Sequence, residues 1–238
     1  GELVDSHDWT PNWTSVAFYE DSGQTFLILL KRHTGRIDIH RMNSNGSVGA
    51  RTYNADWSSG WTQVLPFAVL QPSGSRKWFL FLLKESNGIV HIQEMNANGT
   101  VGNRVTSYNW SAGWSSAAFL QEIGRTSLLM LKQSNGLIHV HQMNSDGTVG
   151  ARTDTRNWSG GYTAMATHAP AVGTPYVLIH KSGSGDGHIH YFSGGALSSE
   201  IEPPTMMAAN GAGMGPDSRA DVDVLTPGDI SALNKLAG

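Results

Sequence analysis

The chain has 238 residues with a net charge of −3, from 16 Lys and Arg against 19 Asp and Glu. It contains no basic run, which argues against a nucleic-acid partner, and no apolar run near the roughly 18 residues that a membrane span needs. The sequence is rich in glycine (28) and tryptophan (8) and contains no cysteine. The absence of cysteine excludes a disulfide scaffold and leaves the compartment open. The length suits one all-β domain or two small domains.

The N-terminal segment is the first predicted element. Its sequence, GELVDSHDW, matches in register the later stretch GARTYNADW, which ends at Trp57. The later stretch is typical of a strand that leads into a loop. We therefore expect residues 1–5 to form a strand that pairs with a sheet built from later residues.

Two anchors then recur along the chain and define repeats. The tryptophans at 9, 57, 110 and 158 are 48, 53 and 48 residues apart, and lysines that close apolar runs stand at 31, 84, 132 and 181. A glycine follows each lysine by four residues. These recurrences mark four units of about 50 residues, near 8–55, 56–108, 109–156 and 157–199.

Each unit carries the signals of strands and tight turns. In the second unit, WTQVLPFAVL and WFLFLLK are short apolar runs rich in aromatic and branched residues, as buried strands require. Asn-Gly turns flank the strand IVHIQEM, and TVGNRVTSY makes a fourth strand. No helical period of useful length occurs in the repeats.

Four strands in each of four units predict an all-β fold, a four-bladed β-propeller over residues 1–199. A β-sandwich or an open array of small sheets is the alternative. In a propeller, the strand at 1–5 would complete the fourth blade and close the ring, which removes exposed sheet edges.

The tail, residues 200–238, departs from the repeat and begins as a loop rich in Pro and Gly. A helix is predicted near 227–236, with Thr226 as its cap and Pro227 in its first turn. Ile230, Leu233 and Leu236 would form an apolar stripe that docks on a surface.

The tail also resembles the end of metzincin zinc proteases. PTMMAAN is similar to their methionine turn, and LTPGDISALNKL is similar to their last helix. The zinc motif H-E-x-x-H is absent from the chain. The resemblance therefore implies a protease-linked architecture without a zinc site, and a C-terminal helix packed on the propeller is the interpretation that we prefer.

The paired aromatics of NWSAGWSS resemble the repeats of the tachylectin-2 and tectonin group of propeller lectins. The matching residues are Asn109-Trp110 with Gly113-Trp114, Asn157-Trp158 with Gly161-Tyr162, and Asp56-Trp57 with Gly60-Trp61. The first unit departs, because Pro11-Asn12 replaces the glycine, and the spacing is shorter than in that group. The resemblance implies a sugar-binding propeller.

A flat indole can stack on the C–H face of a sugar, and a neighbouring Asp or Asn can bind its hydroxyls. The candidate ligand-binding residues are Asp8, Trp9, Asp56, Trp57, Asn109, Trp110, Asn157 and Trp158. Their loop should lie at a blade junction, where two blades provide the walls of a groove. The second aromatic of each pair opens an apolar strand and is expected to be a core wedge between blades.

Histidines form a second constellation. His91, His139 and His188 follow the marker lysines by seven residues, and His141 and His190 follow by nine. Residues two apart on a strand face the same side, so each such pair could contact a ligand or hold zinc or copper. No third ligand recurs beside them, which makes metal binding the lesser alternative.

We therefore expect a carbohydrate-binding lectin with one site per blade or blade junction, and glycans or glycoconjugates as partners. No nucleophile elbow, phosphate loop or recurring carboxylate pair indicates an enzyme, and no cofactor is implied. No signal peptide is recognisable, but a secreted or cell-surface protein is favoured over a cytoplasmic one. The alternatives are a protein-interaction or targeting propeller associated with a metzincin-like metalloprotease, and a metal-binding propeller.

Overall fold

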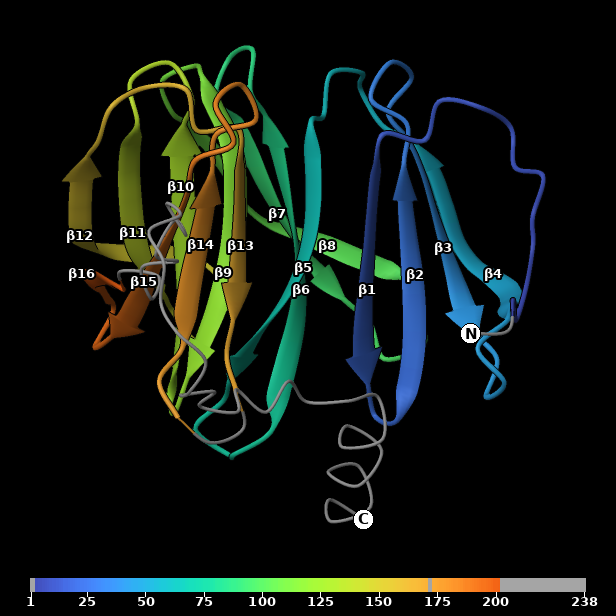
Figure 1. Ribbon diagram of the computed structural model, residues 1–238. Helices are drawn as coiled ribbons and strands as arrows, with labels where there is room; N and C mark the ends of the chain where they lie inside the picture. The colour runs from blue at the N-terminus through green and yellow to red at the C-terminus, as the bar shows by residue number, and fades with distance from the viewer. Residues whose placement is uncertain (1–2, 171–172, 202–238) are drawn as a thin grey trace, which may run out of the picture. The chain divides into compact units, whose positions relative to one another are not determined.

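The protein is built from four antiparallel sheets, seen in a computed structural model that describes residues 3–170 and 173–201 (Figure 1). Each sheet has four strands, hydrogen-bonded to one another in chain order. The strands are β1 Ser15–Asp21, β2 Gln24–Leu30, β3 Arg36–Met42 and β4 Val48–Asp56; β5 Gln63–Leu70, β6 Arg76–Lys84, β7 Ile89–Met95 and β8 Val101–Asn109; β9 Trp114–Glu122, β10 Arg125–Lys132, β11 Leu137–Met143 and β12 Val149–Asn157; and β13 Ala164–His168, β14 Tyr176–His180, β15 Gly187–Ser193 and β16 Ala196–Ile201.

The four sheets stand in a ring as blades one to four, which confirms the predicted four-bladed β-propeller. The innermost strand of each blade is its first, since β1 contacts β5, β5 contacts β9, and β9 contacts β13. The outermost strand of one blade is then joined by a loop to the innermost strand of the next.

Hydrophobic clusters fill the junctions between successive blades. Strand β6 shows how this works: Phe79 and Phe81 pack toward blade three, whereas Leu80 and Leu82 pack toward blade one. Both faces of the strand are buried, so its sequence reads as one continuous apolar run rather than an alternating one. A third cluster joins blades three and four.

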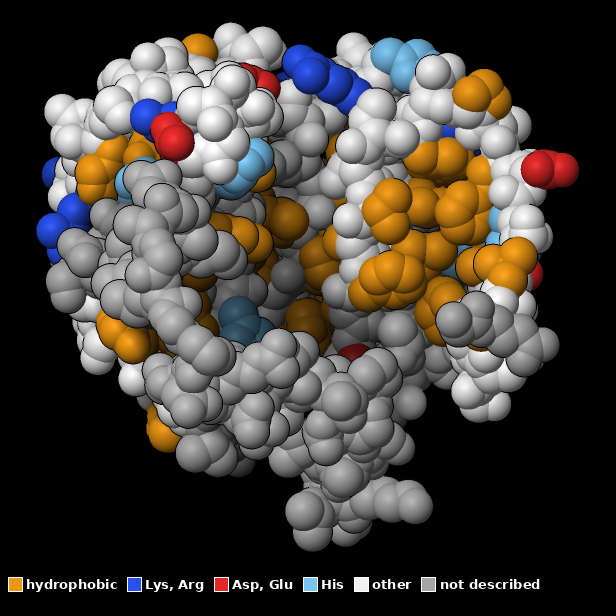
Figure 2. Space-filling model, viewed as in Figure 1, with side chains coloured by type: hydrophobic (Ala, Val, Ile, Leu, Met, Phe, Trp, Pro, Cys, Tyr) orange, Lys and Arg blue, Asp and Glu red, His pale blue; other side chains and the backbone are white. Residues whose placement is uncertain are grey.

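The junction between blades four and one differs. Within residues 3–170 and 173–201, none of the three clusters of buried hydrophobic side chains spans it. Val16 and Phe18 of β1 are 57% and 58% exposed, and Leu178 and Ile189 of blade four are 41% and 43% exposed. Figure 2 shows the hydrophobic side chains gathered over the strands of blade one.

The closing strand expected at residues 1–5 is not found over the described residues 3–5. Asp5 instead accepts a hydrogen bond from the Val48 amide of blade one, at 2.7 Å. Blade four already has a fourth strand of its own, because β16 pairs with β15 after a turn at Gly194 and Gly195. The edge that residues 1–5 were expected to fill is therefore occupied.

The chain divides into two units, Gly1–Glu202 and Pro203–Gly238. The expected boundary between 199 and 200 falls inside β16, which continues the fourth blade to Ile201. The helix predicted near 227–236 and the metzincin-like segments lie outside the described residues. In the described part of the chain, no helix has the length and apolar character needed to cross a bilayer.

In blades one to three, the glycine that follows the marker lysine holds the next aromatic loop in place. Gly88 has φ +72°, and its carbonyl accepts a hydrogen bond from the Trp110 amide at 3.0 Å. A Cβ on Gly88 would lie 2.1 Å from the carbonyl oxygen of Trp110. Gly35 and Gly136 make the same contacts with Trp57 and Trp158. Only glycine allows both this φ and this approach.

Replacing Gly136 with Ala should destabilise the protein more than replacing Gly124 with Ala. Both glycines have φ near +70°, at which a Cβ costs about 1–2 kcal/mol. A Cβ at Gly124 meets nothing within 4 Å, whereas one at Gly136 would lie 2.4 Å from the Ser159 carbonyl oxygen. Urea unfolding of the two variants measures the difference, and equal losses would contradict the proposed role of the contact.

Candidate functional site

The paired aromatics divide into a buried and an accessible member. Trp61, Trp114 and Tyr162 are 2%, 4% and 4% exposed and belong to the clusters between blades, as expected for wedges. The first members, Trp57, Trp110 and Trp158, are half-buried and pack against the edges of the same clusters. In blade one Trp9 is 39% exposed, and Trp13 is half-buried and belongs to none of the three clusters, so blade one lacks the expected wedge.

A cavity of about 230 Å³ in blade three brings the two predicted constellations together. It is lined by Trp110, Ser111, Trp114, Met130, His139 and His141. The first two come from the loop after β8, Trp114 opens β9, and the histidines lie on β11. His139 lies opposite Met130 in the pairing of β11 with β10, so the two side chains share one face of the sheet. Because Met130 packs toward blade two, the cavity opens at the junction of blades two and three.

Ring contacts fix the side chains of this cavity. The Trp110 and His141 rings stack with centroids 5.9 Å apart and planes 13° apart. The Trp114 and His139 rings lie 4.8 Å apart in a tilted arrangement. Tyr108 stacks on Trp110 at 5.3 Å, and its hydroxyl accepts a hydrogen bond from the Val149 amide across the junction. The tryptophan is therefore held by both blades.

The marker lysine is also part of the site. Lys132 Nζ lies 4.9 Å from the centre of the Trp114 ring and donates a hydrogen bond to Ser111 Oγ at 2.8 Å. Sequence reasoning used this lysine only as an anchor of the repeat. Its constant spacing from the aromatic pair, and the Ser or Thr that follows each first tryptophan, are the signals that could have identified it.

The same arrangement recurs in every blade, and we call it the aromatic–histidine site. Lysine lies 4.5–4.9 Å above the second aromatic and bonds the Ser or Thr hydroxyl in all four copies. The members are Trp9, Thr10, Trp13, Lys31, Asp38 and His40 in blade one; Trp57, Ser58, Trp61, Lys84, His91 and Gln93 in blade two; Trp110, Ser111, Trp114, Lys132, His139 and His141 in blade three; and Trp158, Ser159, Tyr162, Lys181, His188 and His190 in blade four.

Aromatic–imidazole contacts accompany the lysine in each copy. Trp9 and His40 lie 6.1 Å apart, and Trp61 and His91 lie 4.7 Å apart. In blade four Trp158 stacks on His190 at 4.7 Å, and Tyr162 meets His188 at 5.7 Å. Every histidine of the second constellation therefore lies beside an aromatic of the first.

The Asp and Asn residues before each first tryptophan do not join the same site. Residues that pair across neighbouring strands lie on the same face of the sheet, as do residues two apart on one strand. Asp56 lines the cavity that holds Trp13 and Asp38 of blade one, rather than the one beside Trp57. Asn109 pairs with Ile89, two residues from His91, and Asn157 pairs with Leu137, two residues from His139. These side chains belong with the preceding blade, and Asp8 is exposed in the N-terminal segment.

The imidazoles of His91, His139 and His141 are neutral at physiological pH. Burial lowers the pKa of His139 to about 4, with further lowering by the nearby Arg152, His141 and Lys132. Burial also lowers the pKa values of His91 and His141. Arg152 Nη1 lies 3.3 Å from His139 Nε2, so the nitrogen accepts a hydrogen bond from the guanidinium and the proton sits on Nδ1.

This arrangement does not favour a metal ion. In the described residues no group of three or more His, Asp or Glu side chains is placed to hold one. The guanidinium of Arg152 also occupies the nitrogen of His139 that a cation would need, and its charge repels a cation.

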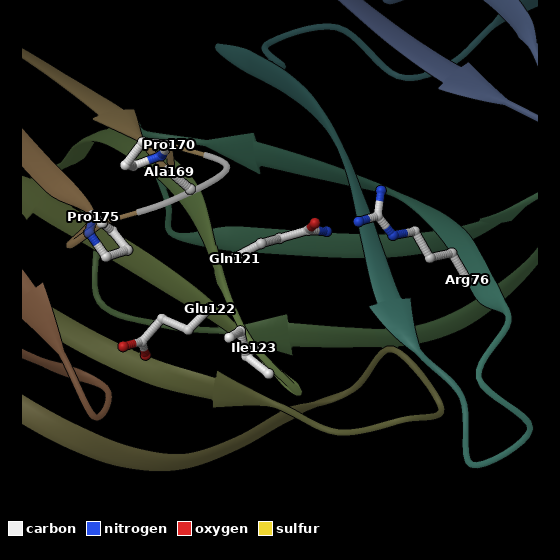
Figure 3. Close-up of a pocket in the computed structure, with 8 residues that line it drawn as sticks. Arg76, Gln121, Glu122, Ile123, Ala169, Pro170 and Pro175 are labelled. Atoms are coloured by element: carbon white, nitrogen blue, oxygen red, sulfur yellow. The ribbon is translucent and has the colours of Figure 1, made fainter. Parts of the chain in front are cut away.

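A larger cavity lies elsewhere, at the opposite end of β9 from Trp114 (Figure 3). It has a volume of about 730 Å³, and the described residues that line it include none of the predicted site residues. Glu122, which lines it, accepts hydrogen bonds from the Gly194 and Gly195 amides at 2.9 and 3.1 Å. That carboxylate therefore connects blade three to the last turn of blade four.

Comparisons with known proteins show the fold alone. No protein-family model matches the chain, and no curated protein matches it. A candidate 6-phosphogluconolactonase from Bacteroides fragilis is similar over 77% of this chain and 55% of its own, with a TM-score of 0.52 and 12% identity. A GH43 β-1,3-galactosidase is similar over 80% and 46%, with a TM-score of 0.53 and 13% identity. The chain spans about half the length of each.

Trp114→Ala should cost about 3–5 kcal/mol of unfolding free energy, as truncation of a buried aromatic does. Trp110→Ala should cost clearly less, because that ring is only half-buried. Urea or thermal unfolding measures both. If Trp110→Ala proves as costly as Trp114→Ala, the first tryptophan is a structural wedge and not an accessible platform.

Stability should fall between pH 6.5 and about 4. An unfolded histidine takes up a proton near pH 6.5, whereas folded His139 takes one up only near pH 4. The unfolded state therefore binds more protons over this interval, and the His139→Gln variant should lose less stability across it than the natural protein. Urea unfolding at pH 7 and pH 4.5 tests this, and an identical loss in both proteins would contradict it.

Proposed function

We propose that the protein is a carbohydrate-binding lectin with one shallow aromatic–histidine site per blade. The observation that carries this proposal is the recurrence, in all four blades, of an aromatic pair, a lysine bound to a hydroxyl and an adjacent imidazole or its replacement. Packing alone explains the buried second aromatic. It does not explain why the accessible first aromatic is always accompanied by polar side chains.

The chemistry of the site matches a sugar ring. The indole of Trp110 offers a flat apolar surface for C–H groups, while Ser111, Lys132 and His139 offer hydrogen-bonding groups for hydroxyls. A cavity of about 230 Å³ suits one terminal sugar residue. These side chains support binding, since glycoside hydrolysis uses a pair of carboxyl groups and the cavity lining contains none.

Repetition adds a second physical argument. Four similar sites on one protein would bind a surface that carries many glycans far more tightly than any single site binds a free sugar. Glycan-bearing surfaces lie outside cells, so we also propose a secreted or cell-surface location. A protein-interaction propeller would instead bind one protein partner without inhibition by free sugars.

Trp110→Ala should lower avidity for a glycan-coated surface by removing one of several sites. The matched control is Phe18→Ala, which removes an aromatic that is 58% exposed but belongs to no aromatic–histidine site. Binding to a glycan array with free-sugar competition measures the effect. Lack of binding to any glycan by the natural protein, or equal binding by both variants, would contradict the proposal.

A further inference from the structure

The aromatic–histidine site of blade three has two cationic side chains at its edge. Lys132 reaches the Ser111 hydroxyl, and Arg152 reaches His139 Nε2. Both bonded groups are neutral, and among the described residues neither cation forms an ion pair with an Asp or Glu. The charges of Arg152 and Lys132 both lower the pKa of His139. The site therefore carries uncompensated positive charge.

The site also has more donors than acceptors. Trp114 is 4% exposed and lines the cavity, yet its indole Nε1–H has no hydrogen-bond partner within the described part of the chain. The same holds for the indole Nε1–H of Trp13 and Trp61 in blades one and two. A buried donor without an acceptor is costly, and a ligand rich in acceptor oxygens would relieve that cost.

Blade two repeats the charge pattern of blade three. Arg104 and Lys84 both lower the pKa of His91, as Arg152 and Lys132 do for His139. Arg104 pairs in register with Gln93, as Arg152 pairs with His141. Two of the four sites therefore place an arginine and a lysine around a neutral imidazole.

Blade one differs at a position that decides the charge. Blade one has Asp38 where blade three has His139, and its carboxylate lies 2.7 Å from Arg36 Nε and 3.4 Å from Arg51 Nη1. Arg51 pairs in register with His40, as Arg152 pairs with His141. The arginine at this position therefore has an anionic partner in blade one, whereas Arg152 bonds to a neutral imidazole in blade three.

We infer that the sites of blades two and three select acidic sugars, with the sugar carboxylate held by the arginine and the lysine, whereas blade one takes neutral sugars. This inference rests on the proposed function and deepens it by naming the ligand class. An arginine binds a carboxylate in bidentate fashion, with charge-assisted hydrogen bonds that a hydroxyl cannot match.

The test compares methyl glucuronide with methyl glucoside, two ligands that differ by one carboxylate. Titration of the full chain is followed through the indole N–H NMR signals of Trp110 and Trp114. The glucuronide should bind the blade-three site with about tenfold lower Kd than the glucoside. Added salt should reduce this preference, because part of it is electrostatic.

Two variants assign the preference to named side chains. Arg152→Gln removes the charge, and His139→Asp reproduces the carboxylate that Asp38 supplies in blade one. Both should bring the Kd ratio of the two sugars in blade three close to one. Arg51→Gln is the matched control, because it removes the equivalent arginine from blade one and should leave the ratio in blade three unchanged.

The outcomes separate the two proposals. Equal affinity for glucuronide and glucoside overturns the acidic-sugar inference and leaves the lectin proposal standing. Lack of response to either sugar overturns the lectin proposal itself. Acetate, titrated in parallel, should bind far more weakly than the glucuronide. If it shifts the indole signals as strongly, the site binds anions without recognising a sugar, and the inference is also overturned.

Discussion

The close approach of a glycine to a tryptophan carbonyl is the contact on which the sites of blades two to four depend. In blades one to three, the turn between the second and third strands carries a glycine whose missing side chain admits the loop to the next blade. That loop is thereby fixed over the junction, with one aromatic in the core and the other at the surface. The cavity, the lysine contact and the imidazole stacking all follow from this placement.

Much of the fold could be predicted from the sequence because the same local signals occur four times. Apolar runs such as the one ending at Lys84 and the Asn-Gly turns each specify strands and hairpins without reference to distant residues. The closing strand could not be predicted in this way. The register of residues 1–5 identifies a strand-like segment, but which edge is free depends on β16, whose sequence barely resembles the other fourth strands.

The site was only partly predictable, for a reason of strand geometry. Trp110 and His141 were identified from their spacing in the repeats. Their rings come into contact as long as every repeat folds in the same way. Asn109 was assigned to the same site because it adjoins Trp110 in sequence. Asn109 ends β8 and pairs with Ile89, which shares a strand face with His91 of blade two, whereas Trp110 lies in the loop that follows. Arg152 was missed because only aromatic residues, lysines and histidines were followed as markers, although the pattern V-G-x-R recurs at 48–51, 101–104 and 149–152.

The strand order within each blade has a consequence for how the chain acquires its structure. Every strand pairs with its neighbour in sequence, so a blade can form from local contacts before any distant one is made. Its buried faces, however, are covered by adjoining blades, as in repeat proteins whose stability is a sum of neighbour contacts. Blades two and three are covered on both sides, so their amides should exchange with solvent most slowly. Local opening should begin in blades one and four.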